Sequence, residues 1–256
     1  MKPLHPGRIA LLTLVLLFGA AGTARANEPN VRLAYAKLQK TCGTTACNRL
    51  VGVVEVKNLA YEKQVTLVYT ADGVQWNETA ASYTAPASNG YERWTFTQDV
   101  PAGAEARFAL RYITAGQTSW DNNGGADYRV GGASAPEFLL GSTTVKLDTA
   151  ILQPGRSGFY VHGTVVLKNL AYAKSVTVVS TIDNWATAQE YTGFYQETLP
   201  GNQERWYISI PTQSNSSTTV PTVRFAIRYT VDGVTYWDNN LGANYSVSYP
   251  DNNTIP

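Results

Sequence analysis

The chain repeats one sequence pattern, and this duplication constrains its fold more than any other feature. Three segments of the first half recur in the second half with few changes: 56–61 as 167–172, 107–112 as 224–229, and 120–123 as 237–240. The six tryptophans form matched pairs: Trp76 with Trp185, Trp94 with Trp206, and Trp120 with Trp237. We therefore expect two domains of one fold, joined in tandem and differing mainly in loop length.

Each copy has the length of a β-sandwich domain, about 100 residues. Short runs alternate apolar and polar residues between turn signals such as Asp72-Gly73 and Asp232-Gly233. No segment keeps a helical period. We predict an all-β chain of two tandem antiparallel immunoglobulin-like β-sandwich domains, at residues 27–131 and 144–256. A short linker over 132–143 would hold them near one another without fixing them rigidly.

Residues 1–26 have the features of a secretory signal peptide. Lys2 and Arg8 precede an apolar run at residues 9–18, and Ala24-Arg25-Ala26 is a small-x-small cleavage site. The run is too short to span a bilayer. We expect cleavage after Ala26, no membrane span afterwards, and a secreted or periplasmic protein; the alternative is an uncleaved anchor.

Export would place the two cysteines, Cys42 and Cys47, in an oxidising compartment. We expect them to form a disulfide that closes a short loop. The alternative is two free thiols. A zinc site is disfavoured, because neither a further cysteine nor a nearby histidine supplies the missing ligands.

The composition argues against several classes of function. Charged residues make up 15% of the chain, and its formal net charge is +1. A protein that reads nucleic acid needs a surplus of Lys and Arg, so we expect no nucleic-acid partner. With His 2 and Cys 2, little material remains for a metal centre or a histidine-based active site. We expect no metal, no cofactor and no catalytic residue.

An enzyme is the rival hypothesis. Glu92 and Asp121 recur in the second copy as Glu204 and Asp238. Most glycoside hydrolases need two carboxylates held across a cleft, but none of these acids has an evident acidic partner. We interpret them as surface or turn-forming carboxylates and predict that the protein is not an enzyme.

The tryptophans divide into a core set and a loop set. Trp94 and Trp206 alternate in phase with Phe96 and Ile208, so we assign them to the cores. The loop set adjoins polar turns and comprises Trp76, Trp120, Trp185 and Trp237. A loop tryptophan is apolar surface held in water unless something covers it; the alternative is that it caps the end of its own sandwich. Sugars stack their C–H faces on such rings, and their hydroxyls form hydrogen bonds with amides. A peptide ligand could bind through similar chemistry.

These motifs resemble carbohydrate-binding module family 21, a starch-binding family that also includes the glycogen-targeting domains of phosphatase regulatory subunits. The resemblance rests on the run 57–65, the loop Trp76, and the 120–123 motif with Tyr128. The second copy carries the same signature at 168–176, Trp185 and 237–245. It implies a β-sandwich that binds α-1,4-linked glucan, often through two surface sites per domain.

The resemblance also implies site residues. The first site would combine loop tryptophans with turn amides: Trp76, Trp120, Asn122 and Asn123 in one domain, and Trp185, Trp237, Asn239 and Asn240 in the other. Ala109 and Ala226 replace the third aromatic of that site, which would narrow the platform. The second site would use Tyr61, Tyr83 and Tyr91, and in the other domain Tyr172 and Tyr191. There Gln203 replaces the third ring, so we expect a weaker second site.

We therefore expect a secreted, non-catalytic protein that binds starch, glycogen or maltooligosaccharides through two tandem modules at once. A separate amylolytic enzyme is a candidate partner. Phosphatase targeting is not supported, because residues 27–256 contain no Arg/Lys-Val-x-Phe docking motif. The alternative is an adhesin or structural β-sandwich protein without sugar binding, which would not require Trp76 and Trp120 to be exposed and close together.

Overall fold

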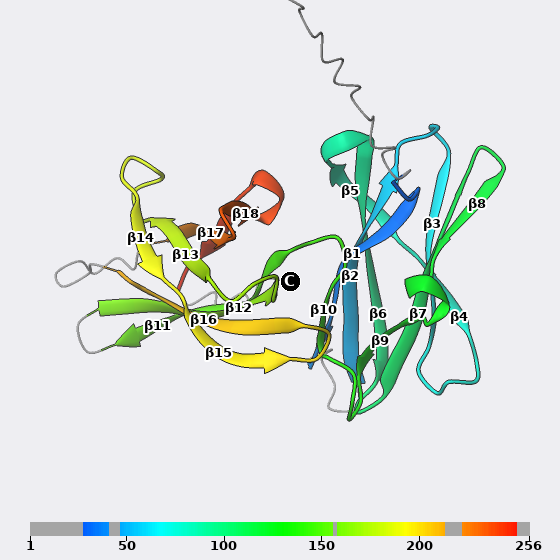
Figure 1. The fold of residues 1–256 in the computed structure, drawn as a ribbon, viewed down its shortest axis with the longest axis horizontal. Coiled ribbons are helices and arrows are strands. Elements are labelled where there is room, and N and C mark those ends of the chain that lie inside the picture. Colours follow the sequence, from blue (N-terminus) through cyan, green and yellow to red (C-terminus); the bar gives the residue numbers. More distant parts are fainter. Residues whose placement is uncertain (1–27, 41–46, 156–157, 213–221, 250–256) are drawn as a thin grey trace, which may run out of the picture.

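Two sandwiches of antiparallel sheets make up the protein (Figure 1). The structure, a computed structural model, describes residues 28–40, 47–155, 158–212 and 222–249. The expected all-β class and the two tandem sandwiches are confirmed. The signal segment and Cys42 lie outside the described residues, so export and the Cys42–Cys47 disulfide stay predictions. None of the helices in the described ranges has the length and apolar character needed to span a bilayer.

The first domain has one sheet of strand order β10-β1-β2-β6-β5 and another of order β4-β3-β7-β8, with β9 paired to β7. Its strands are β1 (Val31–Gln39), β2 (Cys47–Lys57), β3 (Lys63–Thr70), β4 (Asn77–Ala80), β5 (Ser82–Pro86), β6 (Tyr91–Pro101), β7 (Glu105–Thr114), β8 (Gln117–Asp121), β9 (Tyr128–Gly131) and β10 (Phe138–Leu140). Two 3-10 turns, η1 (Ser88–Gly90) and η2 (Asn123–Gly125), join them.

The second domain repeats this arrangement, with sheets of order β11-β12-β16-β15 and β14-β13-β17-β18, and β19 paired to β17. Its elements are β11 (Val145–Gly155), β12 (Gly158–Lys168), β13 (Lys174–Thr181), β14 (Gln189–Thr192), β15 (Phe194–Leu199), β16 (Gln203–Pro211), β17 (Val223–Val231), β18 (Val234–Asp238), η3 (Asn240–Gly242) and β19 (Tyr245–Val247). Irregularities of register recur too, after Leu33 and Leu147 and after Tyr83 and Tyr195.

Strand alternation places one apolar core in each domain. The inward positions of β7 and β17 match one for one and are fully buried: Phe108, Leu110 and Tyr112 in one, Phe225, Ile227 and Tyr229 in the other. Trp94 and Trp206 pack against the two cores and are partly buried. Their assignment to the cores is therefore confirmed.

The segment between the repeats contains a strand that the second domain lacks in its described sheets. β10 pairs with β1, although we expected residues 132–143 to be a linker. Gln203 of β16 then joins the second domain to this strand. Its side chain accepts from Leu140 N at 2.7 Å and donates to Phe138 O at 2.8 Å.

A second set of contacts joins the outer face of the first domain to β11. The buried Lys37 donates to Asp148 O at 2.9 Å, and Lys146 lies over the Tyr35 ring at 5.1 Å. Ser142 also donates to Glu55 at 3.0 Å. These bonds connect the two domains, and the expectation that the short linker holds them near one another without fixing them rigidly stays a prediction.

The aspartate of each Trp-Asp-Asn-Asn motif ties the two sheets of its sandwich together. Asp121 of β8 accepts from Leu33 N of β1 at 2.7 Å and from Tyr128 OH at 2.9 Å. Asp238 repeats both bonds with Leu147 N and Tyr245 OH, at 2.7 and 2.6 Å. Burial and the neighbouring carboxylate raise the pKa of both tyrosines well above the ordinary value, so each hydroxyl remains a donor.

We predict that Asp238→Ala strongly destabilises the second domain. Asp238 is buried 3.6 Å from the buried Lys146, and its loss leaves an uncompensated cation. The expected cost is about 3 kcal/mol in the free energy of unfolding, measured by urea denaturation. Asp99→Ala is the control, because it removes only an exposed ion pair with Arg49, and it should change stability little. Equal effects of both variants would contradict this role for Asp238.

Candidate functional site

The Trp-Asp-Asn-Asn turn presents its tryptophan to solvent while its aspartate points inward. Trp120 and Asp121 are neighbours at the end of β8, so their side chains leave opposite faces of the strand. The turn that follows is closed by Asn122, whose side chain accepts from Gly125 N at 3.0 Å. Asn123 has a φ of 54° and donates to Asp127 O at 3.2 Å. The amides thus shape the turn that carries the ring.

The second copy forms the same turn. Asn239 accepts from Gly242 N at 2.9 Å, and Asn240 donates to Asn244 O at 3.3 Å. The four asparagines that we predicted to bond sugar hydroxyls therefore each commit one side-chain atom to their own loop. Whether the remaining amide atoms also contact a ligand stays a prediction.

An arginine lies over each of these exposed rings. Arg111 stands 5.7 Å from the Trp120 ring centre and forms two bonds to Glu78, at 2.7 and 2.6 Å. In the second domain Arg228 and Glu190 make the same arrangement with Trp237, with the guanidinium at 5.8 Å. These cation–π contacts fix the rings. Sequence analysis missed them, although the recurrence of both arginines in segments 107–112 and 224–229 was a usable signal.

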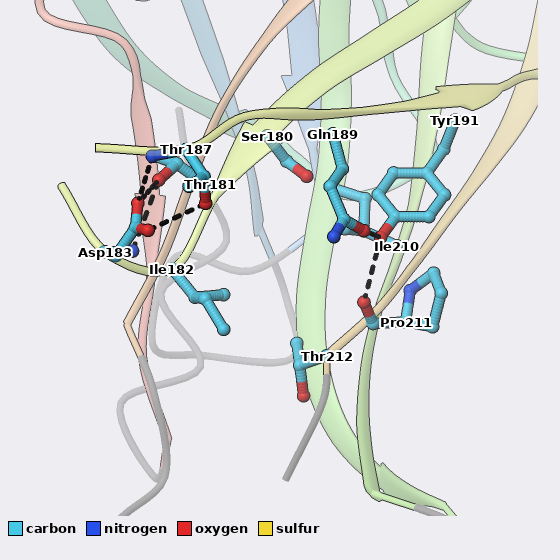
Figure 2. A pocket seen from close by; sticks show the side chains of 10 residues that line it. All are labelled: Ser180, Thr181, Ile182, Asp183, Thr187, Gln189, Tyr191, Ile210, Pro211 and Thr212. Carbon is cyan, nitrogen blue, oxygen red and sulfur yellow. Dashed lines mark hydrogen bonds between the residues drawn. The ribbon is translucent and has the colours of Figure 1, made fainter. Parts of the chain in front are cut away.

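Carboxylates also shape the loops that carry Trp76 and Trp185. Asp72 accepts from Val74 N at 2.8 Å and Gln75 N at 2.9 Å, and these bonds lower its pKa. Asp183 accepts from the backbone N and the hydroxyl of Thr187 and from the hydroxyl of Thr181, as Figure 2 shows. Those bonds lower the pKa of Asp183 to about 2. Both loops therefore hold their shape through an ionised aspartate.

The two loop tryptophans of the second domain lie on the same outer sheet face. In the second domain Trp185 and Trp237 line one open hollow together with Val179, Ala226 and Asn244. In the first domain Arg111, paired with Trp120 across β7 and β8, reaches Glu78, two residues after Trp76. The exposed fractions of the four rings are 43% for Trp76, 50% for Trp120, 37% for Trp185 and 52% for Trp237. They are surface residues and do not cap the cores.

Alanine forms the floor between these rings. Ala109 and Ala226, at the place where a third aromatic was expected from the resemblance, are almost fully buried. In the second domain an amide of Asn244 joins the lining instead. In the second domain the candidate site is therefore a pair of rings on a shallow floor, with neutral groups and one Arg–Glu pair beside them.

The second group of tyrosines divides sharply by exposure. Tyr61 is 98% exposed, whereas Tyr91 is only 2% exposed. Tyr91 donates to Pro29 O at 2.6 Å, and Arg32 lies over its ring at 4.1 Å. This burial argues against a direct contact of Tyr91 with sugar, and its role in binding stays a prediction. Gln203, its counterpart, is buried as well, so this difference gives no reason for a weaker second site in the second domain.

The prediction for Tyr191 also needs correction. Tyr83 pairs with Trp94 and meets it edge-on at 5.9 Å. The residue that does so in the second domain is Tyr195, which pairs with Trp206 and meets it at 6.3 Å. Tyr191 lies on β14 and packs against the core. Its hydroxyl points toward Pro211 in a separate pocket floored by Ile210 (Figure 2). Tyr172, like Tyr61, is fully exposed.

The repeated acids Glu92 and Glu204 are engaged in ion pairs. Lys63 lies 3.3 Å from Glu92, and Lys174 lies 2.7 Å from Glu204. Each acid also accepts from the indole N–H of the core tryptophan two residues later, Trp94 or Trp206. They thus position the core and are not arranged as an acid–base pair. Over the described residues, no group of three or more His, Cys, Asp or Glu could hold a metal ion.

Comparison with known proteins identifies both repeats. The model of the carbohydrate/starch-binding module (family 21) matches residues 25–131 and 140–248. Glucoamylase 1 of Rhizopus oryzae is 42% identical over 84 residues, which are 31% of this chain and 14% of that enzyme. Protein phosphatase 1 regulatory subunit 3E of Rattus norvegicus is 43% identical over 98 residues, 34% of each chain. The chain thus spans only a minor part of either relative.

Among solved structures, the starch binding domain of Rhizopus oryzae glucoamylase, in complex with beta-cyclodextrin and maltoheptaose, is 33% identical to this chain. The match covers 42% of this chain and 97% of that domain, with a TM-score of 0.34. The family model covers most of the chain in two separate regions, each one sandwich with its pair of exposed tryptophans. The chain belongs to the carbohydrate/starch-binding module family 21, as two tandem modules.

Proposed function

We propose that the protein is a non-catalytic, bivalent binder of α-1,4-glucan. The observation that carries this proposal is the outer sheet face on which Trp185 and Trp237 flank the Ala226 floor. Two fixed rings suit the apolar faces of successive sugar units, and a rigid aromatic surface loses little entropy on binding. The family supports the ligand class, since the glucoamylase domain of that family is described with maltoheptaose.

The two modules would act together on one polymer or granule. Both carry two exposed loop tryptophans, and the contacts of Gln203 with β10 connect them. This connection makes the second binding event intramolecular, which raises the affinity for a polymer that can reach both sites. The segment 9–26 supports export, so we place the protein in the secreted or periplasmic space. There a separate amylolytic enzyme would be its partner.

We predict that Trp76→Ala combined with Trp185→Ala removes starch binding while the protein stays folded. Each substitution removes one ring of one platform, so neither module retains its pair. Either single variant leaves one intact module, so its co-sedimentation with insoluble starch should fall by about a hundredfold, the scale of a lost bivalent gain. The double variant should bind more weakly than either single variant.

Two controls accompany this experiment. Val74→Ala changes an exposed apolar residue of the same loop as Trp76 and should leave binding unchanged. Cellulose replaces starch to test the linkage of the glucan. Failure of the parent protein to bind either polymer would refute the proposed function and favour an adhesin or structural role. Unfolding of the double variant would show that these rings stabilise the core.

The different exposure of the predicted site tyrosines gives a second prediction. Tyr61→Ala with Tyr172→Ala should weaken starch binding without changing the melting temperature, because both rings are fully exposed.

Tyr91→Phe should instead lower the stability of the protein. It removes the bond to Pro29 O and should cost about 1 kcal/mol in the free energy of unfolding, with starch binding unchanged. If a well-folded Tyr91→Phe protein binds starch more weakly, Tyr91 contributes to the binding site after all.

Binding should also be insensitive to mild acid. In the folded protein the pKa of Asp183 is about 2, below its ordinary value, so its loop is held by the ionised carboxylate at neutral pH. That support is lost only as the pH falls toward 2. A neutral glucan adds no titrating group. The Trp76→Ala variant, which binds through the second module, should therefore retain its affinity for starch within about twofold from pH 4 to 8. A titration step near pH 6 would contradict this.

A further inference from the structure

A small hollow lies between the domains, directly beside the platform of the second module. The first domain contributes Tyr35, Glu55 and Arg93 from the outer face of its β1-β2-β6 sheet, and the second contributes Trp237, Asn239 and Leu241. In Figure 1 the second domain lies on the side of the first where β10 joins β1. Neither domain alone would form this hollow.

Trp237 borders this hollow and the platform at the same time. It lines the open surface shared with Trp185, and it also lines the space that faces Arg93. Asn239 likewise lines both. A glucan chain stacked on Trp185 and Trp237 that continues past Trp237 therefore meets the first domain.

The contacts around the hollow preform it. Lys146 is buried between the rings of Tyr35 and Tyr245, at 5.1 and 5.0 Å, and it pairs with Asp238, the residue next to Trp237. Ser142 donates to Glu55, a lining residue of the hollow, at 3.0 Å. The indole of Trp237 and the sheet of the first domain are thus held in register before any ligand arrives.

Arg93 supplies hydrogen-bond donors at this place. Its Nε lies 3.6 Å from Glu55, longer than a hydrogen bond, and its Nη1 donates to Pro86 O at 3.4 Å. A guanidinium has five N–H donors, so Arg93 retains several for a ligand. Asn239 adds an amide, and Trp237 adds an apolar wall. Donors and an amide around one ring suit a neutral polyhydroxyl unit and would offer little to an apolar one.

We propose that this interdomain hollow is an additional glucose subsite, which lengthens the glucan-binding platform of the second module and uses Arg93 of the first. The inference rests on the proposed function, since it assumes glucan on Trp185 and Trp237. It makes the two modules unequal: the second holds a longer segment of the chain than the first.

The corresponding place in the first module is not shared between the two domains. Beside Trp120 the neighbouring cation is Arg32 of the same domain, which donates to Glu55 at 2.8 Å and lies over Tyr91 at 4.1 Å. The segment 140–142 also lines this place, including Ser142, whose hydroxyl donates to Glu55. Among the described residues that line it, none belongs to the second sandwich.

The test compares a short and a long ligand on the second platform alone. In the full chain, Trp76→Ala and Trp120→Ala remove the platform of the first module, and calorimetry gives the affinity ratio of maltoheptaose to maltose. Adding Arg93→Gln should lower this ratio about tenfold, the equivalent of one charge-assisted hydrogen bond. Thr143→Phe, at another lining position of the hollow, should lower it similarly by filling the space while keeping Arg93.

Arg205→Gln is the matched control. Arg205 is the counterpart of Arg93 in the repeat and pairs with Glu197 and with Asp148. It is not among the residues that line the hollow, so its substitution should leave the ratio unchanged. The subsite is overturned if neither Arg93→Gln nor Thr143→Phe changes the ratio of maltoheptaose to maltose affinity. It is also overturned if Arg205→Gln lowers this ratio equally. In both cases the proposed function stands. If Arg93→Gln does not fold, Thr143→Phe decides alone. The starting protein here carries Trp76→Ala and Trp120→Ala and keeps the second platform. If it binds neither maltose nor maltoheptaose, the proposed function itself is refuted.

Discussion

The bond between a carboxylate and a strand of the opposite sheet supports both the fold and the exposure of a tryptophan. Asp121 and Asp238 accept a backbone N–H from one sheet and a tyrosine hydroxyl from the other. The two sheets of each sandwich are therefore joined at this point by charge-assisted hydrogen bonds. Since side chains alternate along a strand, an inward aspartate forces the preceding tryptophan outward. One inward bond thus fixes the position of an exposed ring.

Charges in this chain are few and serve mainly to position other groups. Lys174 with Glu204 and Lys146 with Asp238 are buried pairs, and Arg111 with Glu78 lies against Trp120. A buried ion pair adds little net stability, but it specifies geometry. The rings and amides that remain on the surface are neutral, which is the appropriate complement to an uncharged polymer. The low charge content of the sequence reflects this division.

The duplicated pattern predicted the fold and the four exposed tryptophans correctly, because a repeat carries its strand register with it. It could not place Tyr91. That residue faces outward by alternation, yet the segment at Pro29 and the side chain of Arg32 cover it. Tyr191 was misplaced because loop insertions shift the alignment, and only strand pairing shows that Tyr195 is the counterpart of Tyr83. Local patterns predict which way a side chain points, whereas tertiary contacts decide whether it reaches solvent.

The interface between the domains has no counterpart within either repeat, so duplication could not predict it. β10 and Gln203 exist as a pair only because the second module follows the first. The sheet of the first module lines the hollow beside Trp237, while the space beside Trp120 is lined by residues of its own domain and by the segment 140–142. Two nearly identical binding surfaces therefore acquire different surroundings. Tandem duplication in this chain supplies two similar surfaces, and the interface between the copies gives the two exposed tryptophans, Trp120 and Trp237, different neighbours.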